Sequence, residues 1–207
     1  INFKNMENSD LKVRNISVSG LRWNLKENLH ANLNEIKKVK NLPEVLKKIL
    51  YKRNLYEMNI EDYLNPSLKK LFPNPYSLHD MDIAIEIFTK AIFKKEKIGI
   101  LGDYDVDGAS SAAIISKYLE QCGCITFIHI PDRFLEGYGP NEKALKGLHK
   151  KGSKLIVTVD CGISSFEPLK AMSSVDIDVI VIDHHIPDIK LPPAYAIINP
   201  KRVDTEK

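Results

Sequence analysis

The feature that most constrains the fold is an alternation of short apolar runs with helical patterns, which begins near residue 79. Most of these runs are β-branched and lack a polar face, as expected for strands that are covered on both sides. The predicted strands are Ile98–Leu101, Ile125–Ile130, Leu155–Val159, Val179–Ile182 and Ala194–Ile198. The predicted helices cover residues 80–94, 109–121, 141–150 and 165–173. This order predicts an α/β fold with a doubly wound, mostly parallel five-stranded sheet flanked by helices.

The sequence before this alternation has a different character. It is rich in Asn and Lys and carries short helical patterns at residues 42–50, 59–64 and 67–72. Prolines at positions 66, 73 and 75 interrupt these patterns. We therefore expect a small helical amino-terminal region at residues 1–78, followed by the main domain at residues 79–207.

Composition excludes few functions. The net charge of +3 is too small to indicate nucleic-acid binding by itself, although a basic groove is compatible with it. Cys122, Cys124 and Cys161 form an odd set without zinc-type spacing, which suits a reduced, cytoplasmic protein. No apolar run approaches the roughly 20 residues of a membrane span, and no signal-peptide pattern is present, so we expect no membrane partner.

Ligands of doubly wound sheets bind at the carboxyl ends of the strands, so the residues that follow each strand indicate the function. The first predicted strand is followed by GDYDVDG, in which Asp103, Asp105 and Asp107 occupy alternate positions. Three crowded carboxylates repel one another unless a hard divalent cation binds their oxygens. Gly102 and Gly108 are expected to allow the tight backbone turn that brings these side chains together.

Two other interpretations of this acidic segment remain open. It could be a solvated acidic turn, or a calcium loop of the EF-hand type. The EF-hand interpretation is disfavoured because a strand precedes the segment and because Glu120 falls at the wrong spacing.

Two later strands are also followed by polar residues. Asp160, with Cys161 and Gly162 after it, follows the third predicted strand, and Asp183-His184-His185 follows the fourth. Each signal alone has an ordinary structural explanation, such as a helix cap or a pair of surface histidines. Their occurrence at the ends of three strands of one sheet instead predicts a shared site. Mixed carboxylate and imidazole ligands favour manganese or magnesium over a structural zinc.

A loop between the second and third predicted strands, PDRFLEGYGPN at residues 131–141, offers groups for a substrate. Arg133 is a candidate fork for phosphate, and Tyr138 is a candidate ring for base stacking. An ordinary surface loop would explain the same residues.

Together these segments resemble the DHH phosphoesterases. GDYDVDG, Asp160-Cys161-Gly162-Ile163-Ser164 and Asp183-His184-His185 are similar to the first three motifs of that family. The similarity also includes residues 131–141 and 199–202, and it points to the branch of single-strand-specific DNA exonucleases. The resemblance implies a manganese- or magnesium-dependent nuclease that degrades single-stranded DNA from its 5′ end by a two-metal mechanism, in recombination and repair. A single-strand-binding protein and a helicase are the further partners that we expect.

The resemblance also implies roles for individual residues. The metal ligands would be Asp103, Asp105, Asp107, Asp160 and His184. Asp160 would bridge two cations, and His185 would contact the scissile phosphate. Asp183 would orient the histidines from behind them. Arg133, Tyr138 and Asn141 would contact the substrate, and the catalytic set would be Asp105, Asp160, His184 and His185.

One element of the family pattern is missing from this sequence. A fourth motif with another aspartate ligand should lie beyond Arg202, so we expect the domain to be incomplete at its carboxyl end. Two alternatives also follow from the resemblance. The protein could be a DHH hydrolase of pyrophosphate, cyclic dinucleotides or very short oligonucleotides, or it could be a non-catalytic DHH scaffold in replication or repair.

Overall fold

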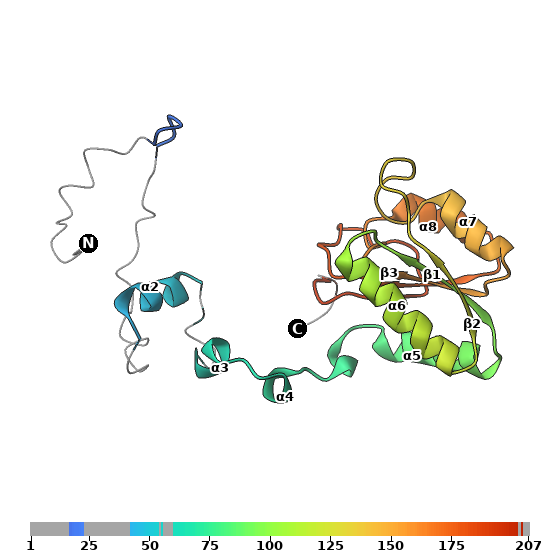
Figure 1. Ribbon diagram of the computed structural model, residues 1–207, viewed down its shortest axis with the longest axis horizontal. Helices are drawn as coiled ribbons and strands as arrows, with labels where there is room; N and C mark the ends of the chain where they lie inside the picture. Colours follow the sequence, from blue (N-terminus) through green and yellow to red (C-terminus); the bar gives the residue numbers. More distant parts are fainter. Residues whose placement is uncertain (1–16, 23–41, 54, 56–59, 203, 205–207) are drawn as a thin grey trace. The chain divides into compact units, whose positions relative to one another are not determined.

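The computed structural model describes residues 17–22, 42–53, 55, 60–202 and 204 (Figure 1). Its contacts divide the chain into two units, residues 1–72 and 73–207. The described residues of the first unit include the helices α2 (Glu44–Lys52), α3 (Ile60–Leu64) and α4 (Leu68–Leu71). Asn59, where α3 was expected to begin, lies outside the described residues. The domain boundary expected between residues 78 and 79 stays a prediction.

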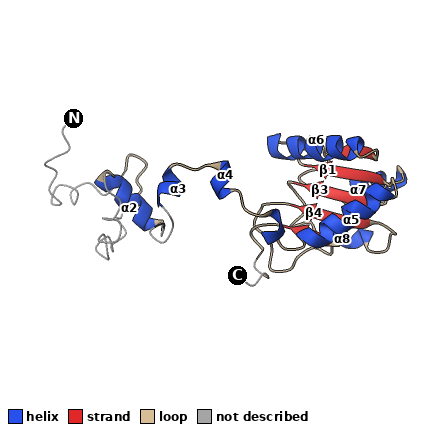
Figure 2. Ribbon diagram, turned by 90° about the horizontal axis from the view of Figure 1, so that it is seen from below, coloured by secondary structure: helices blue, strands red, loops and turns tan. Residues whose placement is uncertain are grey.

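The second unit is built on a five-stranded sheet in which all neighbouring strands are parallel. The spatial order of the strands is β2-β1-β3-β4-β5. Their bounds are β1 (Lys97–Gly102), β2 (Ile125–His129), β3 (Leu155–Val159), β4 (Asp178–Ile182) and β5 (Ala196–Ile198). Figure 2 shows these strands side by side with helices around them. The predicted α/β class and doubly wound sheet are thereby confirmed.

The connecting segments after the short 3₁₀ turn at Pro75–Ser77 are mostly helical. They are α5 (Met81–Phe93), α6 (Val106–Gln121), α7 (Glu142–Lys150) and α8 (Phe166–Met172). The helix expected at residues 109–121 begins three residues earlier than predicted, because Asp105 supplies its amino-terminal cap. Asp107 therefore belongs to the first turn of α6 rather than to a loop.

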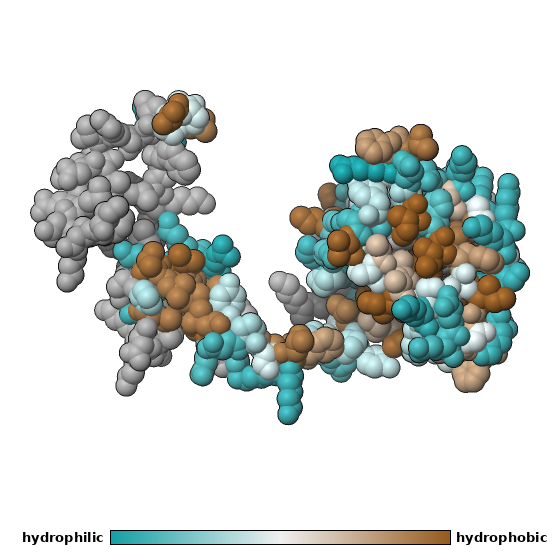
Figure 3. Space-filling model, viewed as in Figure 1, coloured by the Kyte–Doolittle hydropathy of each residue, from teal (hydrophilic) through white to brown (hydrophobic). Residues whose placement is uncertain are grey.

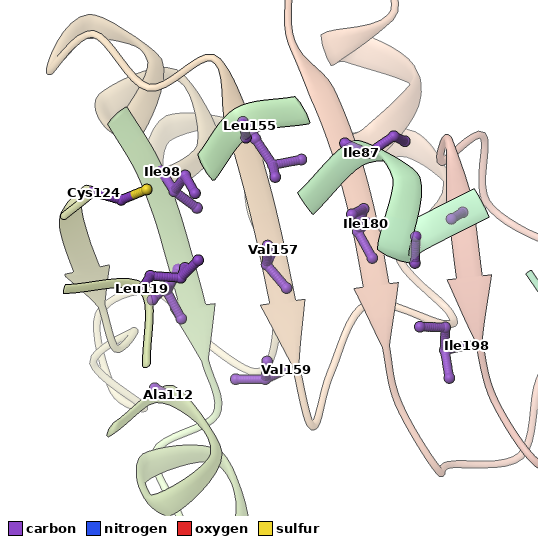
Figure 4. Close-up of a cluster of buried hydrophobic side chains, with 14 residues drawn as sticks. Ile87, Ile98, Ala112, Leu119, Cys124, Leu155, Val157, Val159, Ile180 and Ile198 are labelled. Atoms are coloured by element: carbon purple, nitrogen blue, oxygen red, sulfur yellow. The ribbon is translucent and has the colours of Figure 1, made fainter. Parts of the chain in front are cut away.

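The sheet has a hydrophobic core on each face, because alternate residues of a strand point in opposite directions. On one face, Ile98 and Ile100 of β1 join buried side chains of α5 and α6 (Figure 4). On the other face, Leu101 of β1 joins buried side chains of α7 and α8. All five residues of β3 are buried, which explains why this strand has no polar face.

The surface of the second unit is mixed, with apolar groups in separate patches among hydrophilic side chains (Figure 3). In the part of the chain that the structure describes, no helix has the length and apolar character needed to cross a bilayer.

Candidate metal centre

The polar residues predicted from the sequence follow β1, β3 and β4. β1 and β3 are adjacent in the sheet, but the chain continues from β1 to β2 on one side and from β3 to β4 on the other. The crevice at such a switch point, beyond the carboxyl ends of the strands, is where doubly wound proteins usually bind ligands. Asp103 follows β1 directly and Asp160 follows β3 directly, so both residues lie at this point.

The turn after β1 is organised by Asp105. Its Oδ1 accepts hydrogen bonds from the backbone N–H of Asp107 at 2.9 Å and of Gly108 at 3.1 Å, which caps α6. The Gly108 N–H makes the largest contribution to lowering the pKa of Asp105. The same carboxyl group lies close to that of Asp160, and both belong to one group of neighbouring ligand atoms. Asp105 therefore links the start of the helix to the centre of the site.

The glycines of this turn are required by close packing rather than by backbone conformation. A Cβ atom on Gly108 would lie 2.4 Å from both the N and the O atoms of Asp103. A Cβ atom on Gly102 would lie 2.8 Å from the carbonyl oxygen of Gly108. Neither glycine has a positive φ, so they do not allow the tight turn through a left-handed backbone conformation. What they supply is the close approach of α6 to Asp103.

Asp160 is held in a conformation that is uncommon for a residue with a side chain. Its φ is +60°, in the left-handed region, while its N–H still donates to the carbonyl of Ile182 at 2.9 Å. The residue is only 7% exposed, and its Oδ2 has no hydrogen-bond partner among the described atoms. Asp103, 4% exposed, likewise has an unpartnered Oδ1. Burial raises the pKa of Asp160, and the neighbouring carboxyl of Asp105 raises it further.

Asp183, which follows β4, is surrounded by donors instead. Its Oδ1 accepts from the backbone N–H of His184 at 2.7 Å and of His185 at 3.0 Å, and it lies 2.8 Å from Nδ1 of the His185 ring. Its Oδ2 accepts from the N–H of Ile163 at 3.0 Å. These bonds hold the backbone of both histidines against one carboxylate, and the Nδ1 contact orients the ring of His185.

The two histidines approach the same carboxylate. Nε2 of His184 lies 3.0 Å from Oδ1 of Asp160, and the two imidazole rings meet edge to face at a centroid distance of 4.7 Å. The family resemblance implies that His184 binds metal and that His185 contacts the scissile phosphate. The structure brings a ligand atom from each of them close to Asp160.

Five residues thus converge in two overlapping groups. Asp103, Asp105 and Asp160 offer ligand atoms within 4.8 Å of one another, and Asp160, His184 and His185 do the same. Asp160 belongs to both groups. The arrangement fits one or two hard divalent cations on three grounds: carboxylates that repel one another, two buried oxygens without partners, and mixed oxygen and nitrogen donors.

The loop at residues 131–141 lies beside this cluster. The hydroxyl of Tyr138 is 3.3 Å from Nδ1 of His185 and donates to the carbonyl of Asp160 at 3.4 Å. Burial raises the pKa of Tyr138, and the nearby carboxylates, first Asp183, raise it further. The guanidinium of Arg133 lies 5.3 Å from the ring centroid of Tyr104, within the acidic turn. Both candidate substrate residues are therefore next to the site.

The structure does not bring two of the predicted residues into the cluster. Asp107 is exposed in the first turn of α6 and belongs to neither group of close ligand atoms in the described part of the chain. Asn141 caps α7, because its Oδ1 accepts from the N–H of Ala144 at 2.8 Å, and its Nδ2 donates to Glu136 at 3.2 Å. Both ends of its amide therefore hydrogen-bond to the protein itself, and its contact with substrate stays a prediction.

Asn199 is a supporting residue that the sequence reasoning did not assign a role. It is buried after β5, its Nδ2 donates to the carbonyl of His185 at 3.0 Å, and its Oδ1 accepts from the N–H of Lys201 at 2.7 Å. Two signals in the sequence point to it: its place directly after a buried strand, and its membership of the segment 199–202 that shares the family resemblance.

Comparison with known proteins gives matches that centre on this unit. The family model described as "DHH family, N-terminal domain" matches residues 97–206. The single-stranded-DNA-specific exonuclease RecJ of Bacillus subtilis is 40% identical over 131 residues, which are 63% of this chain and 17% of that protein. The RecJ of Escherichia coli is 35% identical over 184 residues, which are 87% of this chain and 31% of that protein. The chain thus spans less than a third of either relative.

Two solved structures share the fold. A crystal structure of exonuclease RecJ bound to manganese matches with a TM-score of 0.57 and 32% identity, over 63% of this chain and 33% of that chain. The structure of RecJ from Thermus thermophilus in complex with Mn²⁺ matches with a TM-score of 0.56 and 27% identity, over 74% of this chain and 21% of that chain.

Proposed function

Because the chain belongs to the DHH family, we propose that it is the catalytic part of a metal-dependent exonuclease that hydrolyses single-stranded DNA from its 5′ end. The family resemblance read from the sequence motifs is confirmed by the family model and by the RecJ relatives. The activity itself is inferred, since those relatives are much longer than this chain.

The observation that carries the proposal is the pair of buried carboxylate oxygens without partners, Oδ1 of Asp103 and Oδ2 of Asp160. An unpaired buried carboxylate costs several kcal/mol by the usual order of magnitude, so such groups normally have a counter-charge. Asp103 and Asp160 follow adjacent strands and lie in overlapping groups with Asp105 and His184. A bound divalent cation would remove the cost and use all of these donors.

We assign Mn²⁺ or Mg²⁺ to this cluster, with Asp103, Asp105, Asp160 and His184 as ligands and Asp160 shared between two ions. When bound, such ions activate water and neutralise charge on a phosphate. Asp183 orients both histidines through the bonds described above. The Nδ1 contact with Asp183 leaves Nε2 of His185 for the scissile phosphate, as a donor when the ring is protonated.

The choice of single-stranded DNA as substrate rests on the relatives, which are named as single-stranded-DNA-specific exonucleases. Arg133 and Tyr138 supply groups that suit a phosphate and a base next to the cluster. Neither group reads base sequence, which fits a nuclease that degrades any single strand. A cytoplasmic role in recombination and repair, beside a single-strand-binding protein and a helicase, is part of the same proposal.

The test is an assay of the full-length protein on labelled single strands and duplexes, with Mn²⁺, with Mg²⁺ and with a chelator. We expect mononucleotide release from the 5′ end of single strands, dependent on a divalent cation. Asp105→Ala and His184→Ala should abolish release, whereas Asp176→Ala, a matched change at a side chain that is 96% exposed, should not.

Each rival function has its own signature in this assay. Cleavage of dinucleotides alone, with long strands untouched, would replace the exonuclease by another DHH hydrolase. Absence of both manganese binding and hydrolysis would indicate a non-catalytic scaffold.

A further inference from the structure

A cavity of about 530 Å³ opens beside the metal cluster. It is lined by Tyr138, Asp183 and His185, by the turn of Gly162, Ser164 and Ser165, and by Ile186. This volume lies within the range of sites for small ligands and is sufficient for part of one nucleotide. The proposed function uses Tyr138, Asp183 and His185 and leaves the turn of Gly162, Ser164 and Ser165 without a role.

The charge of the cavity does not suit a phosphate. Among the described residues that line it, none is a lysine or an arginine. The acidic lining residue, Asp183, has both of its oxygens occupied by hydrogen bonds from the protein. An anionic group would therefore find no counter-charge here, whereas an uncharged sugar or base would meet no penalty.

The turn after β3 offers two hydroxyl groups to this space. In the described part of the chain, neither Ser164 nor Ser165 makes a hydrogen bond with its side chain. Ser165 stands at the cap position of α8, where a serine usually bonds to the helix, but its hydroxyl makes no such bond. Because a hydroxyl both donates and accepts, the pair can bond to any base or to a sugar.

The remaining walls are apolar or aromatic. Ile186 is 79% exposed, and Tyr138 is 55% exposed although its hydroxyl is bonded inside the site. An exposed ring and an exposed aliphatic side chain in the lining of one cavity offer apolar surface on which a base can stack. Hydroxyls and apolar walls without cations are the chemistry of a nucleoside site.

We infer that this cavity binds the sugar and base of the nucleotide adjacent to the scissile phosphate, with Ser164 and Ser165 as its hydrogen-bonding groups. The inference rests on the proposed nuclease function and specifies where the substrate lies. His185, which lines both the cavity and the metal cluster, would hold the phosphate at the junction of the two.

The first experiment removes the two hydroxyls in the full-length protein as Ser164→Ala/Ser165→Ala. We expect kcat/KM on an oligothymidylate to fall about tenfold, mostly through KM, as the loss of two modest hydrogen bonds implies. The control is Ser174→Ala, whose hydroxyl lies away from the cavity and bonds to the carbonyl of Ala171, and which should leave the kinetics unchanged. Equal melting temperatures would show that both variants fold.

The second experiment removes the base instead. Oligothymidylates with an abasic residue directly 5′ or directly 3′ of the first scissile bond are compared with the intact strand. One of the two positions should lower kcat/KM about tenfold in the wild type, because the base that stacks in the cavity is lost.

The possible outcomes distinguish a failure of the proposed nuclease function from a failure of the nucleoside site. No cleavage of the intact strand by the wild type would overturn the proposed function and the nucleoside site with it. Normal cleavage that ignores the abasic residue at both positions, or a double serine variant with unchanged kcat/KM, would overturn the nucleoside site alone.

Discussion

Two buried aspartates at the ends of neighbouring strands have opposite surroundings. Asp183, after β4, is 5% exposed and receives bonds from three backbone N–H groups and one imidazole. Asp160, after β3, is 7% exposed, and its Oδ2 has no partner among the described atoms. Burial without donors is costly, whereas burial with donors is compensated. In the proposed function, Asp183 accordingly holds the site together and Asp160 binds the cation.

The backbone supports the same distinction. Asp160 occupies the left-handed region with a φ of +60°, at an expected cost of about 1–2 kcal/mol, whereas Asp183 is absent from the residues with positive φ. Strained residues with a side chain are common at functional sites, where the surrounding structure holds them in place. The turn after β3 therefore carries both a buried carboxylate oxygen without a partner and backbone strain, and the turn after β4 carries neither.

The largest effect is expected for Asp160→Asn on turnover. Loss of a shared cation ligand should lower kcat about a thousandfold or more, which corresponds to roughly 4 kcal/mol of transition-state stabilisation. The metal-free variant should be more stable than the wild type, by about 1 kcal/mol, because an unpaired buried charge is removed. Single-turnover kinetics and metal-free thermal unfolding measure the two quantities, with Asp176→Asn as the exposed control.

Asp183→Ala should affect folding as well as activity. Three backbone donors, including the N–H of Ile163, would lose their partner, so we expect the free energy of unfolding to fall by about 3 kcal/mol. Denaturant unfolding of the metal-free proteins measures this free energy of unfolding. A variant as stable as the wild type would contradict the supporting role of Asp183 and remove the contrast with Asp160.

A smaller loss of stability is expected at the turn after β1. Gly108→Ala places a Cβ against backbone atoms of Asp103 and should cost about 2 kcal/mol through overpacking. Gly147→Ala is the matched control inside α7, where a Cβ meets nothing within 4 Å, and it should raise stability by about 0.5–1 kcal/mol. Equal effects of the two substitutions in urea unfolding would disprove the close approach of α6 to Asp103.

The smallest expected effects are changes of folding stability with pH. They have opposite signs for Asp80, whose pKa is lowered, and for Asp160, whose pKa is raised. At Asp80, burial raises the pKa, but bonds from the N–H of Ile197 and from Arg202 outweigh it, so the pKa is lowered. Its stabilising contribution is therefore present above the ordinary aspartate pKa of 3.8 and is lost as the pH falls through its folded pKa. The pKa of Asp160 is raised, so its unfavourable charge appears as the pH rises through that folded pKa.

The stability gained by Asp160→Asn in metal-free protein should consequently vanish in acid and grow toward neutral pH. Asp80→Asn should instead flatten the loss of stability in acid. Unfolding curves at several pH values, in the presence of a chelator, measure both trends. A pH-independent gain for Asp160→Asn would show that its carboxyl is not perturbed in the fold.

The sequence predicted the architecture and the meeting point of the site. Short apolar runs identified all five strands, and the rule for strand ends placed Asp103, Asp160 and His184 at one edge. These inferences succeed because buried strands appear in the sequence as apolar runs, and because their alternation with helical patterns predicts a parallel sheet.

Side-chain direction within the turns was less predictable. Asp107 points away because Asp105 begins the helix earlier than its apolar pattern shows, and Asn141 serves as a cap. Asn199 supports the carbonyl of His185 from a segment that carries no periodic signal. Each of these depends on a local hydrogen bond, which competes with other arrangements that the same sequence would allow.

The most direct test of the difference between the two turns is calorimetric titration of Mn²⁺ into the full-length wild type, Asp160→Asn and Asp176→Asn. The account predicts that the wild type and Asp176→Asn bind manganese alike, and that Asp160→Asn binds it roughly 100-fold or more weakly, since even changes behind a ligand cost 10- to 100-fold. Undiminished manganese binding by Asp160→Asn would contradict the claim that the unpaired carboxylate at the end of β3 is built for a cation.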